Sequence, residues 1–465
     1  MNHEEVSDQI IERICDCGWK AYLTGGAVRD SFINIEPLDY DIVTDAPPEE
    51  LMRIFPDRKV KMGIGTNFLV TLIDGIDVAT YRSDRNTGPG RFNCEATACE
   101  TLEEDLARRD FTVNAFAVCP YTGDVVDPYN GRKDLNEKII RFVGDPNERI
   151  YEDELRMIRA ARFVCLLEGE LHPRTFNAIK EKRDLVKNIS PERIATELVK
   201  VMKYKKPSIF FNVLHETGIL EIIFPEVERL YGHPGGMHHN ETLDTHSLIV
   251  GDSLSPKDPI LRLIGYFHDI GKPLAWDFNN DGTFVNHENL GAHMIEKLFK
   301  RFKFPNDETE RAKSLVALHM RSLPDLKTGK AIRRALNKFA EFHISWKEWM
   351  LLKIADQKGN LGKPNYTRDQ IKKVVLKIHK AKSEVKKADY TKSILDLNGH
   401  DIMKAFDIPQ GVHIGHILNN LFQVVLDDPS LNEKDTLLKI AKENDLWVHS
   451  LTDSLEKNSS RRLRS

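Results

Sequence analysis

Two aspartates near the start of the chain, one residue apart, are the first side chains that suggest chemistry. Asp39 and Asp41 lie in an alternating segment, 39–44, that predicts a strand, and residues i and i+2 of a strand share a face. Adjacent carboxylates repel unless a cation lies between them, and Mg²⁺ prefers carboxylate and phosphate oxygens. Upstream, Gly25 and Gly26 follow an apolar segment and open a helical one, so their backbone N–H groups can approach a triphosphate. The combination predicts a magnesium site that activates an attacking hydroxyl and stabilises a pyrophosphate leaving group.

A third carboxylate lies in a predicted hairpin. Segments 68–73 and 76–81 are strand-like, and the Asp74-Gly75 pair between them suits a tight primed turn. On the second strand, the side chain of Asp77 either joins the same metal site or is an exposed polar position of an alternating strand.

Histidines and aspartates form a second group within residues 238–360. The segment LRLIGYFHDIGKP places His268 and Asp269 side by side at the end of an apolar helix, where they can supply a nitrogen and an oxygen ligand together. Imidazole and carboxylate ligands suit Mn²⁺, Fe²⁺, Co²⁺, Ni²⁺ or Zn²⁺ better than Mg²⁺ alone. The expected chemistry is metal-assisted hydrolysis, with a purely structural metal site as the alternative. The candidate ligands are His246, His268, Asp269 and Asp356, with His287 and His319 for a second metal and His293 as a weaker candidate.

Composition narrows the class of protein. The chain has 465 residues, of which 41% are hydrophobic and 30% charged, so a packed core is expected rather than disorder. With 67 basic and 71 acidic residues the formal charge is −4, which excludes a globally basic coat and requires any polyanion to bind a local patch.

Location is predicted from what the sequence lacks. No stretch of 18 apolar residues occurs, so we expect no membrane span, and the polar start MNHEEVSDQI is unlike a signal peptide. The six cysteines form no C-x-x-C pair, which argues against a disulfide framework or a zinc knuckle. These features predict a protein of the reducing cytoplasm.

The secondary-structure pattern changes along the chain. Residues 5–18 predict an amphipathic helix and 20–24 a strand, whereas strand signals fade beyond residue 150. Helical spacing recurs in 151–168, 192–203, 257–270, 289–302 and 308–320. Eight lysines in 372–392 indicate either a solvated helix face or contacts with an RNA backbone, and their spacing does not separate the two.

Several motifs occur in one order and together resemble a known family. GGAVRD, DYD, LEEDLARRDFTVNAFA, DPYNGRKDL, YEDELRMIRAARF and ISPERIATEL resemble the class II tRNA nucleotidyltransferases, which include the CCA-adding enzymes, and the bacterial poly(A) polymerases. Residues 397–418 carry a weaker tail motif of the same family. The His-Asp segment, with NHENLGAH and ALHMR, resembles the HD phosphohydrolase superfamily, whose modules occur in many family members.

The resemblance implies an α+β fold. Its head is a polymerase β-like nucleotidyltransferase domain with a mixed sheet, and an all-helical neck, HD body and tail follow. The boundaries expected are 1–130 for the head, 131–225 for the neck with its nucleobase-recognition motif, 226–365 for the HD body and 366–465 for an RNA-binding tail.

The resemblance also assigns residues. Asp39 and Asp41 resemble the family's Mg²⁺-binding carboxylates, and Asp77, argued from the hairpin, is the third expected catalytic carboxylate. The expected nucleotide contacts are Gly25, Gly26, Arg29, Arg109, Asp110, Asn114, Asp153, Arg156, Arg159 and Arg162.

One pair of these residues has a physical rationale for choosing the base. Asp153 and Arg156 are three apart and share one face if they lie on a helix. Asp accepts hydrogen bonds and Arg only donates them, which matches the exocyclic amine and ring nitrogen shared by cytosine and adenine. Guanine and uracil present the reverse pattern. An ordinary surface salt bridge is the alternative.

The sequence therefore predicts an enzyme that adds CCA, or only the terminal A, to the tRNA 3′ end from CTP and ATP, releasing pyrophosphate. It also predicts a metal-dependent phosphohydrolase activity, and no obligate protein partner is evident. A long polar segment, 81–95, resembles the flexible loop that accompanies A addition. The first alternative is a poly(A) polymerase, but residues 61–70 lack the paired arginines of that branch. The second is an HD phosphohydrolase whose head binds nucleotide without polymerising.

Overall fold

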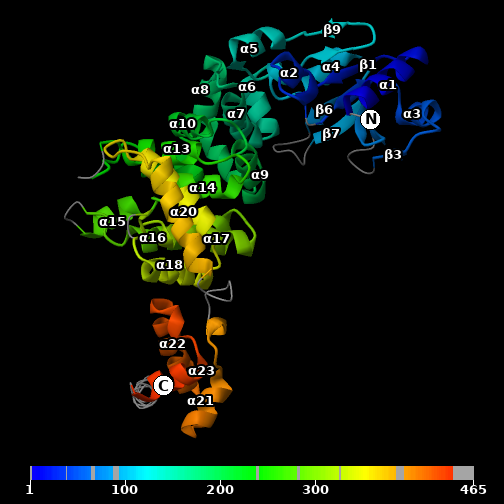
Figure 1. Cartoon of the computed structure of the whole chain (residues 1–465). Coiled ribbons are helices and arrows are strands. Elements are labelled where there is room, and N and C mark those ends of the chain that lie inside the picture. The colour runs from blue at the N-terminus through cyan, green and yellow to red at the C-terminus, as the bar shows by residue number, and fades with distance from the viewer. Residues whose placement is uncertain are drawn as a thin grey trace, which may run out of the picture. The chain divides into compact units, whose positions relative to one another are not determined.

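The computed structural model describes most of the chain, in ranges separated by short gaps. These ranges are 3–37, 39–63, 69–86, 94–236, 240–279, 283–323, 326–383 and 392–443. The chain divides into two compact units. The first is Met1–Arg229 with Ser255–Pro259 and Arg301–Lys303, and the second is Leu230–Leu254, Ile260–Lys300 and Phe304–Ser465. Strands gather in the N-terminal part of the chain and helices make up nearly all of the rest (Figure 1).

A seven-stranded mixed sheet forms the centre of the N-terminal part, in the order β3-β4-β5-β2-β1-β8-β9. Its strands are β1 (Ala21–Thr24), β2 (Asp41–Thr44), β3 (Val60–Met62), β4 (Val70–Ile73), β5 (Ile76–Thr80), β8 (Ala117–Val118) and β9 (Val125–Val126). Strands β2 and β5 are parallel, and the other neighbouring pairs are antiparallel. The mixed sheet predicted from the sequence is confirmed.

The predicted hairpin is present as β4 and β5. Ile73 pairs with Ile76 across a two-residue turn in which Asp74 and Gly75 both have positive φ, at 50° and 93°. This geometry matches the right-handed twist of the flanking strands. The turn therefore fixes the register of β4 against β5, and the separate parallel ladder of β5 with β2 places Asp77 opposite Asp41.

Among the described residues up to 111, four α-helices and a two-stranded ribbon accompany this sheet. They are α1 (His3–Asp16), α2 (Gly26–Phe32), α3 (Pro48–Ile54) and α4 (Leu102–Ala107), with the antiparallel strands β6 (Arg82–Asn86) and β7 (Cys94–Ala98). Helix α1 buries Val6, Ile10 and Ile14 in one hydrophobic cluster with Ile42 and Val78 of the sheet, as its amphipathic pattern predicts. Residues 87–93 of the predicted flexible loop lie outside the described residues.

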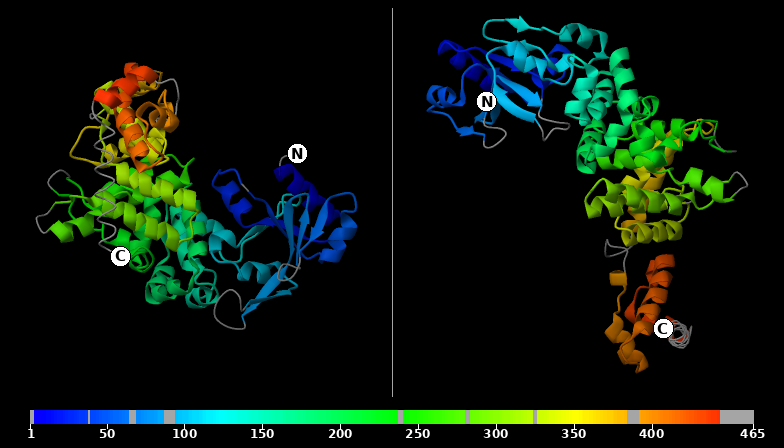
Figure 2. Two further views of the ribbon diagram at one scale, coloured as in Figure 1. Left: turned by 90° about the horizontal axis from the view of Figure 1, so that it is seen from below. Right: turned by 180° about the vertical axis from the view of Figure 1, so that it is seen from behind.

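Helices dominate residues 131–228, with one short exception. The elements are α5 (Gly131–Glu137), β10 (Ile139–Ile140), α6 (Pro146–Glu152), α7 (Leu155–Leu167), β11 (Glu170–Leu171), α8 (Pro173–Lys182), α9 (Pro191–Val201), α10 (Ser208–Glu216), α11 (Leu220–Ile223) and α12 (Pro225–Glu228), with 3-10 turns η3 (Thr112–Asn114) and η4 (Arg183–Asn188). The exception is the parallel pair β10·β11 in the neck, which the sequence did not indicate. In the two further views of Figure 2, the colours show that helical residues come after the strand-rich N-terminal part in the sequence.

Helices also build the described residues of the second unit. They are α13 (Leu243–Ser253), α14 (Pro259–Phe267), α15 (Lys272–Asn279), α16 (His287–Arg301), α17 (Asn306–Leu318), α18 (Gly329–Glu341), α19 (Trp346–Gly359), α20 (Arg368–Ser383), α21 (Gly399–Phe406), α22 (Val412–Asp427) and α23 (Lys434–Glu443), with η6 (Lys392–Ile394) and η7 (Pro429–Leu431). Helices α13 and α19 approach closely because Gly359 has no side chain. A Cβ there would lie 2.6 Å from Val250 Cγ2 and 2.8 Å from His246 Nδ1.

The tail is joined to α18 by a buried arginine. Arg333 donates hydrogen bonds to the carbonyls of Leu426 and Asp427, both at 2.7 Å, and so caps the C-terminus of α22. Of the lysine-rich segment, residues 372–383 lie in α20 and 384–391 lie outside the described residues.

Candidate active sites

A cavity of about 1250 Å³ in the first unit collects nearly every predicted nucleotide-site residue. The predicted residues that line it are Gly25, Gly26, Arg29, Asp39, Asp41, Arg109, Asp110, Asn114, Asp153, Arg156, Arg159 and Arg162. Its lining holds nine arginines and one lysine against six carboxylates. A cavity with this excess of cations suits a polyanion such as a triphosphate.

The three predicted catalytic carboxylates cluster at the start of β2. Asp41 is the first residue of β2 and lies opposite Asp77 in the parallel ladder with β5. Asp39 precedes the strand, so the prediction that it shares the strand with Asp41 is wrong, although both line the cavity. Asp77 is exposed, and it does not belong to the described residues that line the cavity.

Electrostatics at Asp41 fit a cation site. The surrounding protein partly desolvates this carboxyl and raises its pKa, Arg109 lowers the pKa, and the negative charges of Asp77 and Asp39 raise it again, for a net upward shift. Three carboxylates that repel one another gain stability from a divalent ion with oxygen preference. The residues present therefore fit Mg²⁺.

Gly25 is required at the mouth of this site by its backbone and by its neighbours. Its φ is +67°, which glycine adopts without strain. A Cβ at this position would lie 3.2 Å from Arg109 Nη1 and 3.3 Å from Asp41 Oδ2. The absence of a side chain lets these two functional groups approach the main chain.

Gly25→Ala is expected to lower kcat/KM for nucleotide addition about 10-fold or more, because the added methyl displaces the Arg109 and Asp41 side chains. Gly25 has φ 67° and ψ −130°, outside the left-handed helical region, and a side chain there adds strain on the order of 1–3 kcal/mol. Steady-state kinetics with a thermal melt would check this. Gly123→Ala is the matched control, since Gly123 also has positive φ but meets nothing within 4 Å. Equal kinetic losses in both variants would contradict the explanation.

A chain of hydrogen bonds joins four predicted residues. Arg29 Nη1 donates to Asn114 Oδ1 at 2.7 Å, Asn114 Nδ2 donates to Asp110 Oδ1 at 3.0 Å, and Arg159 Nε donates to Asp110 Oδ2 at 2.9 Å. Burial pushes the pKa of Asp110 upward, but Arg159 and the Asn114 amide outweigh it and hold the pKa at about 2. Asp110 is therefore an ionised acceptor at neutral pH, suited to a ribose hydroxyl.

Asp153 and Arg156 lie in the cavity but do not share a helix. Helix α6 ends at Glu152, Asp153 is extended at φ −154° and ψ 105°, and α7 begins at Leu155. The prediction of one helix over 151–168 is wrong here, because the Asp153 carboxylate accepts the Leu155 N–H and an ion pair instead of continuing the helix.

Each member of this pair is held by another residue. Arg193 Nη2 of α9 lies 2.9 and 2.7 Å from the two oxygens of Asp153. Arg156 pairs with Glu152 and donates to the carbonyl of Arg149 at 2.9 Å. Sequence reasoning included Arg193 in the ISPERIATEL motif but assigned it no role.

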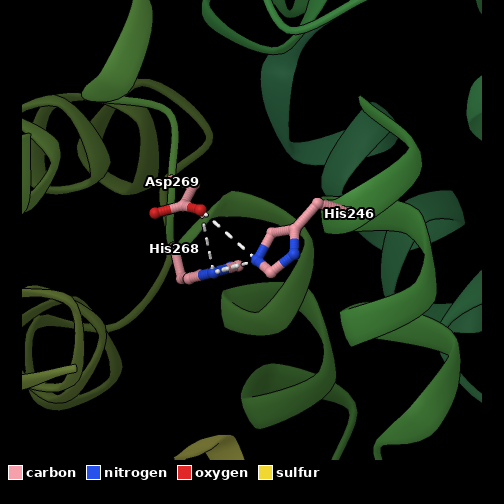
Figure 3. Close-up of side chains that lie close together, drawn as sticks. All are labelled: His246, His268 and Asp269. Carbon is pink, nitrogen blue, oxygen red and sulfur yellow. Dashed lines mark hydrogen bonds and ion pairs between the residues drawn. The ribbon is translucent and has the colours of Figure 1, made fainter. Parts of the chain in front are cut away.

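The second cluster lies in the second unit and joins five helices. His246 is on α13, His268 and Asp269 follow α14, and Asp356 is on α19. The Nε2 atoms of His246 and His268 lie 3.2 Å apart. Asp269 Oδ2 lies 3.4 Å from His246 Nε2 and 3.2 Å from His268 Nε2. The three side chains point toward one another (Figure 3). Asp356 Oδ1 lies 3.3 Å from His246 Nε2. We call these four residues the first metal position.

Asp269 also faces a second group. Its Oδ1 lies 3.5 Å from Nε2 of His287, the first residue of α16, and 3.4 Å from Nε2 of His319, which follows α17. These three residues form the second metal position, and Asp269 is shared between both. His293 lines a separate cavity of about 920 Å³.

The histidine tautomers are set by main-chain carbonyls. The Nδ1 atoms of His268, His287 and His319 lie 2.8, 2.7 and 2.6 Å from the carbonyl oxygens of Gly265, Phe284 and Val316. A carbonyl only accepts, so each Nδ1 carries a proton, and the neutral form of each ring then has its lone pair at Nε2.

These lone pairs converge. His287 Nε2 and His319 Nε2 are 3.2 Å apart, a distance at which two lone pairs repel unless a cation or proton separates them. Both oxygens of the buried Asp269 lack a hydrogen bond of good geometry. Burial raises the pKa of Asp269, but His268 and Lys272 outweigh it and hold the pKa well below its ordinary value. This donor set of neutral imidazoles and an ionised carboxylate fits divalent transition metals.

Comparisons with known proteins cover most of the chain. Residues 21–141 match the poly A polymerase head domain, 170–230 the probable RNA and SrmB-binding site of polymerase A, and 242–390 the HD domain. The chain is 33% identical over 365 residues to a multifunctional CCA protein of Xanthomonas campestris pv. campestris strain B100, covering 74% of this chain and 86% of the relative. A multifunctional CCA protein of Legionella pneumophila subsp. pneumophila strain Philadelphia 1 is 34% identical over 323 residues, covering 65% and 74%.

Solved structures share the fold. A Bacillus stearothermophilus CCA-adding enzyme in complex with CTP aligns with a TM-score of 0.65 at 24% identity, covering 98% of this chain and 100% of that one. A Thermotoga maritima CCA-adding enzyme complexed with tRNA aligns at 0.54 and 18% identity, covering 94% and 95%. None of the helices among the described residues is long and apolar enough to cross a membrane.

Proposed function

This chain belongs to the family of CCA-adding tRNA nucleotidyltransferases and related poly(A) polymerases, and from that premise we propose that it adds CCA, or the terminal A, to the tRNA 3′ end. The substrates are CTP and ATP, and the product released is pyrophosphate. The observation that carries the proposal is the convergence of Asp39 and Asp41 with an arginine-rich lining in one cavity. Because tRNA is matured in the cytoplasm of bacteria, we propose the same compartment for this activity.

The head residues act on the triphosphate and the ribose. Asp39 and Asp41 hold Mg²⁺, which neutralises phosphate charge and activates the attacking 3′-hydroxyl when bound. Arg109 and Arg159 line the same cavity and offer fork-shaped donors to phosphate oxygens. Asp110, ionised and oriented by the Asn114 amide, accepts a hydrogen bond from a ribose hydroxyl. Asp77 contributes negative charge next to Asp41.

Base choice is proposed to rest on Asp153 and Arg156, without a nucleic-acid template. The Asp153 carboxylate accepts from the exocyclic amine of cytosine or adenine, and Arg156 donates to the adjacent ring nitrogen. Arg193 holds both oxygens of Asp153 and so fixes the plane of the carboxylate.

Arg193→Ala is expected to lower the selectivity for CTP over UTP about 10-fold, because Asp153 loses the partner that orients it. One imperfect hydrogen bond to a charged acceptor is worth about 1.5 kcal/mol, which corresponds to that factor. Competitive incorporation into tRNA ending at the discriminator base would measure it. Arg301→Ala is the control, since it removes an arginine that also contacts both oxygens of a carboxylate, Glu226, but lies outside the cavity lining. Unchanged selectivity in Arg193→Ala would count against the proposed role.

One experiment separates the activities within the family. The protein is incubated with each nucleotide and with tRNA ending at the discriminator base, at C, or at CC. Addition of C, C and A in order supports full CCA synthesis, and A addition only to the CC end supports the narrower activity. Unlimited ATP addition to an oligo(A) primer, with none to tRNA, would favour a poly(A) polymerase instead.

A second activity, metal-dependent hydrolysis of phosphoesters, is proposed for the residues of the two metal positions, which we call the HD cluster. It is supported by two groups of buried ligands that share Asp269. His246, His268 and Asp356 complete the first metal position, and His287 and His319 complete the second. The metal, one of Mn²⁺, Fe²⁺, Co²⁺, Ni²⁺ or Zn²⁺, polarises the phosphoester and water when bound.

We also propose that the functional boundaries follow those expected from the sequence. The head then spans 1–130, the neck 131–225, the HD body 226–365 and the tail 366–465. Acceptor RNA is proposed to lie along the neck and the tail, where exposed lysines of α20 such as Lys372 and Lys373 offer phosphate contacts.

A further inference from the structure

His246 differs from the other three histidines of the two metal positions in what lies next to its Nδ1 atom, the ring nitrogen that points away from the metal positions. The outer nitrogens of the other three lie against main-chain carbonyls, whereas His246 Nδ1 faces Glu241 Oε1 at 3.6 Å. The Glu241 side chain is only 1% exposed, and its other oxygen, Oε2, accepts the N–H of Leu361 at 3.0 Å. The distance exceeds that of a hydrogen bond, so this carboxylate acts on His246 through its charge, which favours a proton on Nδ1 and raises the basicity of Nε2 toward a metal.

We propose that Glu241 is the positioning residue of His246 and makes the two metal positions unequal, so that the first position binds a divalent ion more tightly than the second. The inference rests on the proposed hydrolase function of this cluster. Each position brings together three convergent candidate ligands, and the first has Asp356 as a fourth candidate beside His246. Glu241 adds a negative charge behind the first position.

The charges around the first position make Glu241 decisive. Lys272 Nζ lies 2.7 Å from Asp269 Oδ2, and Lys353 Nζ lies 2.7 Å from Asp356 Oδ2. These two ammonium groups offset the two ligand carboxylates that face the first position. Glu241 adds a third buried carboxylate next to His246, and its charge acts on the Nδ1 side of that ring.

Glu241→Gln separates this role from simple hydrogen bonding. The glutamine oxygen can still accept the Leu361 N–H, which leaves the NH₂ group facing His246 Nδ1. An NH₂ donor at Nδ1 places the ring proton on Nε2, where the metal lone pair is needed. The substitution therefore keeps the shape and works against ligation at His246.

Glu288→Gln is the matched control. Glu288 Oε2 lies 3.7 Å from His287 Nδ1, much as Glu241 lies from His246, but its side chain is 27% exposed. His287 Nδ1 already donates to the Phe284 carbonyl. We expect Glu288→Gln to bind metal like the unaltered protein.

The test is a calorimetric titration of the metal-depleted full-length chain with Ni²⁺ alone, together with the metal content after dialysis. The unaltered chain is expected to bind two ions with different affinities. Glu241→Gln should weaken the tighter binding about 10- to 100-fold and change the weaker binding less than about threefold. His287→Ala should remove only the weaker binding, which identifies the two positions.

The outcomes distinguish this inference from the proposed hydrolase. Two ions bound with unchanged affinities in Glu241→Gln would overturn the inference and leave the metal site intact. No binding by the unaltered chain would defeat the hydrolase proposal itself. A thermal melt checks folding in each variant, because Glu241 lies in the second unit and nucleotide addition reports on the first. If Glu241→Gln no longer melts cooperatively, Glu241→Asp, which keeps the charge, decides: tight binding within about 10-fold of the unaltered chain supports the inference, and any larger loss overturns it.

Discussion

Asp41→Asn is expected to reduce nucleotide incorporation into tRNA more than about 1,000-fold, a loss of about 4 kcal/mol of transition-state stabilisation. Asp41 begins β2, lines the cavity and faces Asp77 and Asp39. A neutral amide removes one of the charges that hold Mg²⁺ against the triphosphate while keeping the size of the side chain. Incorporation of radiolabelled CTP into tRNA that lacks its 3′ end measures the effect.

Two comparisons make this result specific to the metal site. Asp57→Asn, at an exposed aspartate paired with Arg13, should incorporate CTP like the unaltered chain. Hydrolysis of a chromogenic phosphodiester by Asp41→Asn should stay within about twofold of normal, because the HD cluster uses none of the head residues. Incorporation by Asp41→Asn at more than a tenth of the normal rate would show that the polymerising carboxylates are elsewhere.

Asp269→Asn is expected to abolish phosphodiester hydrolysis by more than about 1,000-fold and to empty both metal positions together. Its two oxygens face different histidine groups, Oδ2 toward His246 and His268, and Oδ1 toward His287 and His319. The amide removes the one negative charge that both positions share. Hydrolysis rates and metal content of the same preparation would measure the two losses.

The control for this variant is Asp307→Asn, an exposed aspartate in the first turn of α17. It should keep both metal and activity, since loss of a helix-dipole contact is worth less than about 1 kcal/mol. CTP incorporation into tRNA by Asp269→Asn should stay near normal. Retention of one bound ion by Asp269→Asn would mean that the two positions do not depend on a shared bridge.

Local signals in the sequence carried much of the fold. The Asp74-Gly75 turn predicted the hairpin, because positive φ at two successive residues favours these residue types. The apolar spacing of Val6, Ile10 and Ile14 predicted α1 and the face it buries. Such features depend on residues that are close together in the sequence, so the sequence alone is enough to predict them.

Contacts between distant segments were not predictable in the same way. Arg193 pairs with Asp153 across 40 positions, and that ion pair accompanies the break between α6 and α7 that helical spacing concealed. The carboxylate behind His246 gave no signal, since Glu241 resembles any polar residue before a helix. Asp39 fell outside β2 because strand pairing with β1 stops at Asp41.

The hydrogen bonds from His268, His287 and His319 to the main chain of Gly265, Phe284 and Val316 affect how well the metal positions tolerate mutation. Each acceptor is a peptide oxygen three residues upstream, and every amino acid supplies that oxygen. A codon change at an acceptor position alters the side chain and leaves the orienting group in place. These three imidazoles therefore keep their orientation when the acceptor residues are substituted. His246 faces a side chain instead, so a single substitution at Glu241 removes its partner.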